Sequence, residues 1–292
     1  MAPRCILTTW AHRLGLVLLA ALGGCSQERI EDIAAENNDS SNPIRVVSLD
    51  YCADQFLLKL ADPEQILALS PDAGASFSYL RDEAQDSPTV RPRAEELIAL
   101  TPDLAIRSYG GGPRIASFLA AAGVQTHQLP WVNAIDGDDA NSVPGVIRGV
   151  AQAIGQEERG ETLIAEYRAR LAALPGRSGA TTALYMTAGG ATTGEGSLIH
   201  EMINAAGLSN FETRRGWHPL PLESLAYDQP DVAASAFFAG RNDHVMAWSS
   251  ARHPIARDLR ALPASVALDG ASTACGGWFI ADAMEALSGA AL

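Results

Sequence analysis

The sequence predicts an α/β protein with two doubly wound lobes, whose mainly parallel sheets are joined by one long bridging helix. Three observations lead to this fold. Strands alternate with helices before residue 142 and again after residue 175, which is typical of parallel sheets covered on both faces. Between these regions, residues 143–174 carry apolar side chains at helical spacing. One short motif also recurs at the same step of each alternating region, which indicates two equivalent lobes.

The first lobe is expected at residues 44–141. Its short apolar runs predict strands at 44–49, 66–70 and 104–106, and the next strand is expected at 124–129. Apolar residues at helical spacing predict helices at 53–60, 95–100 and 115–122. A run of glycines at 110–112, followed by Pro113, predicts the turn that leads into the last helix.

The bridging segment is expected at residues 142–175 and the second lobe at residues 176–292. Only Gly155 and Gly160 interrupt the helical pattern of the bridge, so it forms one long helix or two nearly continuous ones. In the second lobe the same patterns predict strands at 183–186, 232–238 and 266–268, and helices at 198–206, 255–262 and 279–287. Ser197 is expected to cap the first of these helices.

The repeated motif reads E-x-L-x4-P-D followed by an apolar residue. It begins at Glu95 in the first lobe and at Glu223 in the second. In both lobes the Pro-Asp pair opens a predicted buried strand. The motif therefore supports two lobes of the same design.

The N-terminal residues have the features of an export signal. Two arginines precede an apolar stretch at residues 14–22, which is shorter than the roughly 20 residues that span a bilayer. The stretch ends at Leu22-Gly23-Gly24-Cys25, which resembles the lipobox of bacterial lipoproteins. We therefore predict a signal peptide at residues 1–24, lipidation of Cys25 and a flexible polar tether at residues 25–43. A plain secretory signal with an incidental cysteine is the alternative, and both place the chain in the periplasm or on the exterior of the cell envelope.

The charge and the motifs exclude several classes of function. The formal net charge is −13, and it becomes −15 without residues 1–24, because these contain two arginines and no acidic residue. Nucleic-acid binding needs clustered Lys and Arg, so we expect no nucleic-acid partner. The sequence has no G-x-S-x-G elbow, no phosphate-binding lysine loop and no H-E-x-x-H motif. We expect no catalytic residues, no cofactor and no enzymatic activity.

Two cysteines, Cys52 and Cys275, remain in the predicted lobes. In an oxidising compartment two thiols can pair as a disulfide. They can equally be small buried residues, and the sequence leaves both interpretations open.

From Arg45 to the C-terminus the chain resembles the periplasmic binding proteins for vitamin B12 and ferric siderophores, which serve ABC importers. The resemblance rests on RVVSLDYCADQFLLKLADPEQILALS, AEELIALTPDLAI, the bridge, TAGGATTGEGSLIHEMINAAGL, LESLAYDQPDV and HPIARDLRAL, in that order. It implies a monomer that holds a ferric siderophore or a cobalamin-type chelate between two lobes and meets the membrane only through its lipid anchor. It also implies that Glu95 and Glu223 contact arginines of the importer permease.

Ligand contacts are expected from loops at the carboxyl ends of the strands, where aromatic and basic residues gather. The candidates are Asp50, Tyr51, Phe77, Tyr79, Arg107, Tyr109, Trp131, Arg215, Trp217, His218, Trp248 and Trp278. Flat aromatic side chains suit a large planar ligand, and arginines suit the negative groups of a siderophore.

A binding protein that coordinates Zn²⁺ or Mn²⁺ directly is the alternative. Its histidine ligands would have to converge, but the histidines are scattered along the sequence, so we expect no metal site.

Overall fold

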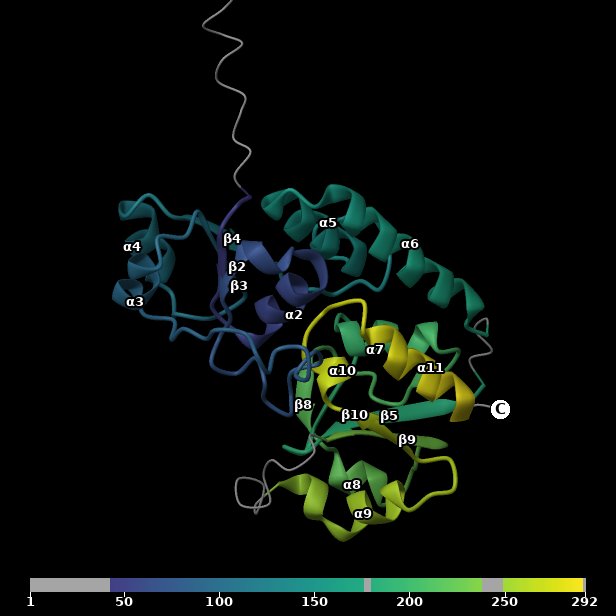
Figure 1. The fold of residues 1–292 in the computed structure, drawn as a ribbon. Coiled ribbons are helices and arrows are strands. Elements are labelled where there is room, and N and C mark those ends of the chain that lie inside the picture. The colour runs from purple at the N-terminus through teal and green to yellow at the C-terminus, as the bar shows by residue number, and fades with distance from the viewer. Residues whose placement is uncertain (1–42, 176–179, 238–248, 291–292) are drawn as a thin grey trace, which may run out of the picture. The chain divides into compact units, whose positions relative to one another are not determined.

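Two separate four-stranded sheets form the framework of the computed structural model, which describes residues 43–175, 180–237 and 249–290 (Figure 1). The strand orders are β2-β1-β3-β4 and β10-β9-β5-β7, and every neighbouring pair is parallel. The prediction of an α/β protein with two mainly parallel lobes is therefore confirmed. No helix within the described ranges combines the length and the apolar character needed to cross a membrane. Cys25 and Trp248 lie outside the described residues.

In the first lobe, helices cover both faces of the sheet. Its strands are β1 (Val46–Ser48), β2 (Ile66–Ala68), β3 (Leu104–Arg107) and β4 (Gln125–Gln128). Its helices are α2 (Tyr51–Leu60), the 3-10 helix η1 (Pro63–Gln65), α3 (Ala94–Ala99) and α4 (Ile115–Ala121). Because side chains alternate across a strand, Ile106 packs in the cluster that includes α2, whereas Ala105 packs in the cluster that includes α3 and α4.

The bridge consists of two helices, α5 (Val143–Ile154) and α6 (Glu157–Ala173), and not of one continuous helix. Helix α5 ends at Gly155, whose φ of 71° is a left-handed conformation that favours glycine. Helix α6 then packs against α5. A Cβ atom on Gly160 would lie 2.5 Å from the Cβ of Ala151, so the absent side chain permits this close approach. Gly155 and Gly160 thus each have a structural reason.

The second lobe repeats the design of the first. Its large sheet contains β5 (Thr182–Thr187), β7 (Ser209–Asn210), β9 (Val232–Phe237) and β10 (Val266–Asp269). Helices α7 (Leu198–Ala205), α10 (Ala271–Ala274) and α11 (Ile280–Ala290) lie on one face in Figure 1, and α8 (Leu222–Leu225) and α9 (Pro254–Arg260) on the other, with the 3-10 helix η2 (Ser250–Arg252) before α9. The expected cap is present, because the Ser197 hydroxyl accepts a hydrogen bond from the His200 backbone N–H at 3.1 Å.

The second lobe also contains a small sheet that the sequence patterns did not predict. Strand β6 (Ala191–Thr193) pairs antiparallel with β8 (Trp217–Pro219). Each strand has only three residues, and β8 ends in a proline, so neither gives a clear strand pattern.

The repeated motif has the same structural role in both lobes. Asp103 accepts a hydrogen bond from the Arg45 backbone N–H at 2.8 Å, and Asp231 accepts one from the Thr182 backbone N–H at 2.7 Å. Each aspartate therefore joins the start of its own strand to the start of the neighbouring strand. The strand orders β2-β1-β3-β4 and β7-β5-β9-β10 correspond element by element, which confirms that the lobes are equivalent.

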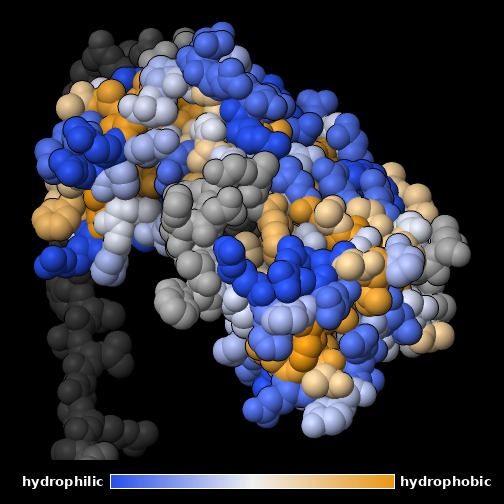
Figure 2. Space-filling view, turned by 90° about the horizontal axis from the view of Figure 1, so that it is seen from below, coloured by the Kyte–Doolittle hydropathy of each residue, from blue (hydrophilic) through white to orange (hydrophobic). Residues whose placement is uncertain are grey.

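The two lobes and the bridge share one hydrophobic cluster. It contains Phe56 of the first lobe, Tyr167 of α6 and Phe279 of the second lobe, all of them buried. The surface of the protein is more polar than this cluster. Hydrophilic residues cover most of the face shown in Figure 2, and hydrophobic residues appear there in small groups.

Candidate ligand-binding site

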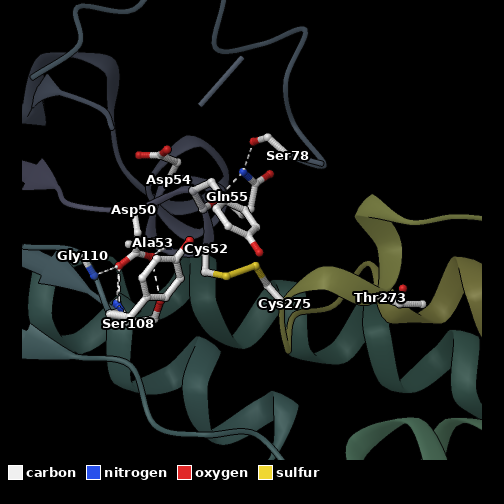
Figure 3. The surroundings of a disulfide bond; sticks show 12 residues. Asp50, Cys52, Ala53, Asp54, Gln55, Ser78, Ser108, Gly110, Thr273 and Cys275 are labelled. Carbon is white, nitrogen blue, oxygen red and sulfur yellow. Dashed lines mark hydrogen bonds between the residues drawn. A yellow bond between two sulfur atoms is a disulfide. The ribbon is translucent and has the colours of Figure 1, made fainter. Parts of the chain in front are cut away.

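The first helix of the first lobe organises the carboxyl edge of its sheet through Asp50. This residue caps α2 by accepting a hydrogen bond from the Ala53 backbone N–H at 3.1 Å. Its carboxylate also accepts bonds from the backbone N–H groups of Ser108, Tyr109 and Gly110 at 2.7, 3.0 and 2.8 Å. The Ser108 hydroxyl adds a further bond at 2.8 Å (Figure 3). Since the side chain is 4% exposed and bonded on both oxygens, Asp50 positions the loop after β3 and has little capacity left for a ligand.

Gln55, which lies within α2, holds the loop after β2 in place. Its amide nitrogen donates to the Ser78 hydroxyl at 2.6 Å, and its oxygen accepts from the Leu80 backbone N–H at 2.6 Å. The same nitrogen donates to the Tyr51 carbonyl at 2.9 Å. One helix therefore fixes two loops that carry candidate residues. Sequence reasoning missed Gln55, because an isolated glutamine in an amphipathic helix reads as a surface residue.

These two loops and the start of α2 bring three aromatic side chains together. The Tyr51 ring lies 4.6 Å from the Phe77 ring and 6.1 Å from the Tyr109 ring, both in edge-on arrangements. Tyr109 is 57% exposed, whereas Phe77 is largely buried. Burial, Tyr51 and Asp50 raise the pKa of the Tyr109 phenol, so it is protonated at neutral pH. We call Tyr51, Phe77 and Tyr109 the aromatic triad.

A buried carboxyl group lies on the inner side of α2. Asp54 is fully buried and accepts hydrogen bonds from the Ser70 backbone N–H at 2.9 Å and from the Ser70 hydroxyl at 2.6 Å. Burial is the largest influence on this group and raises its pKa to about 7. Asp54 ties α2 to the segment after β2, and no sequence pattern identified it.

A disulfide bond links the lobes next to the triad. Cys52, in the first turn of α2, is bonded to Cys275, which follows α10, and their Cα atoms are 5.6 Å apart (Figure 3). Of the two interpretations that the sequence left open, the structure contains the pair.

Two further ligand candidates belong to the contact between the lobes. The Tyr79 hydroxyl donates to Asp282 at 2.5 Å, and its ring stacks on Phe279 at 4.7 Å. Trp278 is 7% exposed and packs edge-on against Phe56 at 5.6 Å. These side chains hold the lobes together, which the sequence could not reveal because their partners are at least 200 positions away.

Arg107 is also placed differently from the expectation. It is 7% exposed, points to the α3 and α4 side of the sheet and donates to the Gly112 carbonyl at 3.0 Å. Among the described residues no carboxylate pairs with it. Through this hydrogen bond, Arg107 stabilises the glycine turn at residues 110–112.

Of the remaining candidates, Trp131, Arg215 and Trp217 are exposed, and His218 is half-buried. Trp131, in the connection from β4 to α5, is 75% exposed, and Trp217 of β8 is 48% exposed with its ring 6.2 Å from that of Tyr185. His218 lies beside Trp217, and its Nε2 is 2.6 Å from the Arg215 carbonyl oxygen. In the described part of the second lobe, Tyr185 and Trp217 thus form an aromatic pair in an edge-on arrangement.

Comparison with known proteins identifies the family. A family model described as periplasmic binding protein matches residues 46–247, which is more than half of the chain. The chain belongs to this family. The resemblance deduced from the sequence is thereby confirmed at the level of the family. A search of curated proteins found no match.

Solved structures of other periplasmic binding proteins have the same fold. A periplasmic heme binding protein from Pseudomonas aeruginosa is 24% identical with a TM-score of 0.65, over 85% of this chain and 92% of that one. The heme-binding protein RhuT from Roseiflexus sp. RS-1 is 24% identical with a TM-score of 0.62, over 86% and 100%. A protein of an ABC-type Fe3+-hydroxamate transport system from Saccharomonospora viridis is 18% identical with a TM-score of 0.60, over 85% and 93%. Identities this low establish the fold of the periplasmic binding protein and not its ligand.

In this periplasmic binding protein, Glu95 and Glu223 occupy equivalent places. Each lies in the first turn of a short helix, α3 or α8, and each is exposed. Two residues further on, Leu97 and Leu225 are fully buried and fix each helix to its lobe. Neither glutamate has an ion-pair or hydrogen-bond partner for its carboxylate within the described part of the chain.

The described residues contain no group of three or more His, Cys, Asp or Glu side chains that could hold a metal ion.

Proposed function

We propose that this periplasmic binding protein holds a bulky iron chelate between its two lobes and delivers it to an ABC importer. The aromatic triad is the observation that carries the proposal. It lies at the carboxyl edge of the first sheet, where α/β proteins bind their ligands. Its most exposed member, Tyr109, sits in a loop that Asp50 holds in place. Flat aromatic side chains provide large contact areas for a planar chelate.

Heme is the chelate that this chemistry suits best. A porphyrin is flat and largely apolar, and tyrosine is one of the protein ligands of heme iron. Tyr51 and Tyr109 offer phenol groups beside an apolar ring, Phe77. Two of the three solved structures described above are named heme-binding proteins, and the third belongs to a Fe3+-hydroxamate system. Ferric siderophores are therefore the second ligand class to test, and cobalamin the third.

Titration of the purified protein tests this proposal. Hemin, a ferric hydroxamate siderophore and cobalamin are added separately, and tryptophan quenching and native mass spectrometry report binding. We expect one-to-one binding of hemin with a shifted Soret band. Tyr109→Phe is expected to change that band and weaken binding about tenfold, because it removes the phenol oxygen but keeps the ring. Tyr227→Phe is the matched control, since Tyr227 is 93% exposed and precedes the amino end of β9.

The outcomes separate the ligand classes. Binding of the siderophore without binding of hemin would assign the site to siderophores and remove heme. Absence of binding to all three compounds, with the protein folded, would refute the proposal of an iron-chelate carrier.

Delivery is proposed to depend on Glu95 and Glu223. Two exposed, unpaired carboxylates at fixed positions on an acidic protein can orient it on a basic receptor and increase the rate of encounter. Replacing both with alanine should leave chelate affinity unchanged and abolish uptake in the source bacterium. Glu166→Ala, an exposed glutamate on α6, is the control and should leave uptake normal. Normal uptake by the double variant would refute the docking role.

A further inference from the structure

The outer surface of the first lobe contains a groove between α3 and α4, which lie side by side in Figure 1. Its volume is about 610 Å³. Ile98 and Phe118 line it, and they are 37% and 56% exposed. Ile115, which is buried, also lines it. Large apolar side chains gathered in one groove of a soluble protein commonly mark an interaction site.

The groove also has a defined charge pattern. Glu95 lies on its α3 wall and Arg114 on its α4 wall, and both are exposed. Neither side chain has an ion-pair or hydrogen-bond partner among residues 43–175, 180–237 and 249–290. Arg93, which also lines the groove, is paired with Glu96 at 3.7 Å. The groove therefore offers one unpaired negative group and one unpaired positive group on either side of an apolar surface.

The second lobe does not reproduce this groove. Alignment of the repeated motif places Ala226 at the position of Ile98. Alignment of α4 with α9, through Leu119 and Leu259, places Asp258 at the position of Phe118. Both leucines are almost completely buried, which supports this correspondence. The two lobes thus share an exposed glutamate but differ in the surface around it.

We infer that the groove receives a segment of the membrane-spanning subunit of the importer. That segment places an apolar side chain between Ile98 and Phe118, a Lys or Arg against Glu95 and an Asp or Glu against Arg114. The inference rests on the proposed delivery function and adds to it the contacts of the first lobe. Because the second lobe carries Asp258 in place of Phe118, these contacts are specific to the first lobe.

Charge and size favour this occupant over a second copy of the chain. The chain has a net charge of −13, so two copies repel each other. The groove is also lined by ten residues, fewer than the roughly 20–30 residues a side in the contact of a stable dimer. A partner that contributes a basic and an apolar group, and that also contacts Glu223, fits both observations.

Cross-linking in the source bacterium identifies the occupant. A photoreactive benzoylphenylalanine replaces Phe118 in one strain and Ser224, the exposed neighbour of Glu223, in another. We expect both positions to cross-link to the same membrane-spanning importer subunit, identified by mass spectrometry. If only position 224 reaches that subunit, the groove inference is wrong and the delivery function stands. If neither does, both are wrong. Cross-links from position 118 to residues 26–42 of the same chain, or to a second copy, also overturn the inference.

A substitution series measures the contribution of the groove. Phe118→Ser is expected to reduce uptake about tenfold at limiting chelate, because truncation of an aromatic interface residue commonly costs this much. Phe118→Leu should retain most uptake, and Ala120→Ser, at an exposed position of α4 outside the groove, should retain all of it. Thermal unfolding and chelate affinity verify that each variant folds and binds. Uptake by Phe118→Ser equal to that of Ala120→Ser would contradict the inference.

Discussion

Removal of the disulfide between Cys52 and Cys275 should lower the stability of the protein markedly without separating the lobes. The bond joins residues 223 positions apart and therefore closes almost the whole folded chain into one loop. The folded lobes do not depend on it alone, because they share a hydrophobic cluster and the bond between Tyr79 and Asp282. The main effect is expected in the unfolded chain, which gains conformational freedom when the cross-link is absent.

The size of the effect follows from the loop length. For a loop of 223 residues, the chain-entropy relation gives an upper value of about 5 kcal/mol at 25 °C. Measured effects are commonly smaller, so we expect a loss of about 3–5 kcal/mol in the free energy of unfolding. The m value should rise as well, because an unfolded chain without the cross-link exposes more surface to denaturant.

Urea unfolding of the wild type and of the double variant Cys52→Ala/Cys275→Ala provides the assay, with and without a thiol reductant. The oxidised wild type should unfold at the highest urea concentration, and the reduced wild type should resemble the double variant. Reductant should not alter the double variant, which serves as the control. Equal free energies of unfolding for the oxidised and reduced wild type, within about 1 kcal/mol, would refute the reasoning.

Three other predictions concern protonation and anchoring. Burial raises the pKa of Asp54 to about 7 in the folded state, so the folded protein binds the carboxyl proton more tightly than the unfolded chain does. The free energy of unfolding should therefore fall by about 3 kcal/mol between pH 5 and pH 8, as this proton is lost. Asp54→Asn should remove that part of the slope in unfolding titrations, and an unchanged slope would exclude the assignment. If the Tyr109 phenolate binds ferric iron, one proton is released, so hemin affinity should rise about tenfold per pH unit near neutrality, whereas Tyr109→Phe should show no such rise. Cys25→Ala should move the protein from the membrane fraction to the soluble fraction, and continued sedimentation with membranes would argue against a lipid anchor at this residue.

The sequence by itself determined the class of fold, the equivalence of the lobes and the family. These features depend on hydrophobic periodicity and on a repeated motif, both of which are local in the chain. The motif that begins at Glu95 and Glu223 identified the equivalent helices α3 and α8, because a fully buried leucine follows each glutamate in the same turn. The ends of the predicted strands agree with the structure to within about two residues, whereas the short strands β6, β7 and β8 were not predicted.

The tertiary structure decided which of the candidate side chains hold the protein together. Asp50, Tyr79, Trp278 and Arg107 have the residue types of a binding site, but the structure uses them for loop and lobe contacts. Aromatic and charged residues have the same appearance in a sequence whether they contact solvent, ligand or a distant loop. Their role depends on partners that folding brings together from far along the chain, as it does for the disulfide and for the groove between α3 and α4.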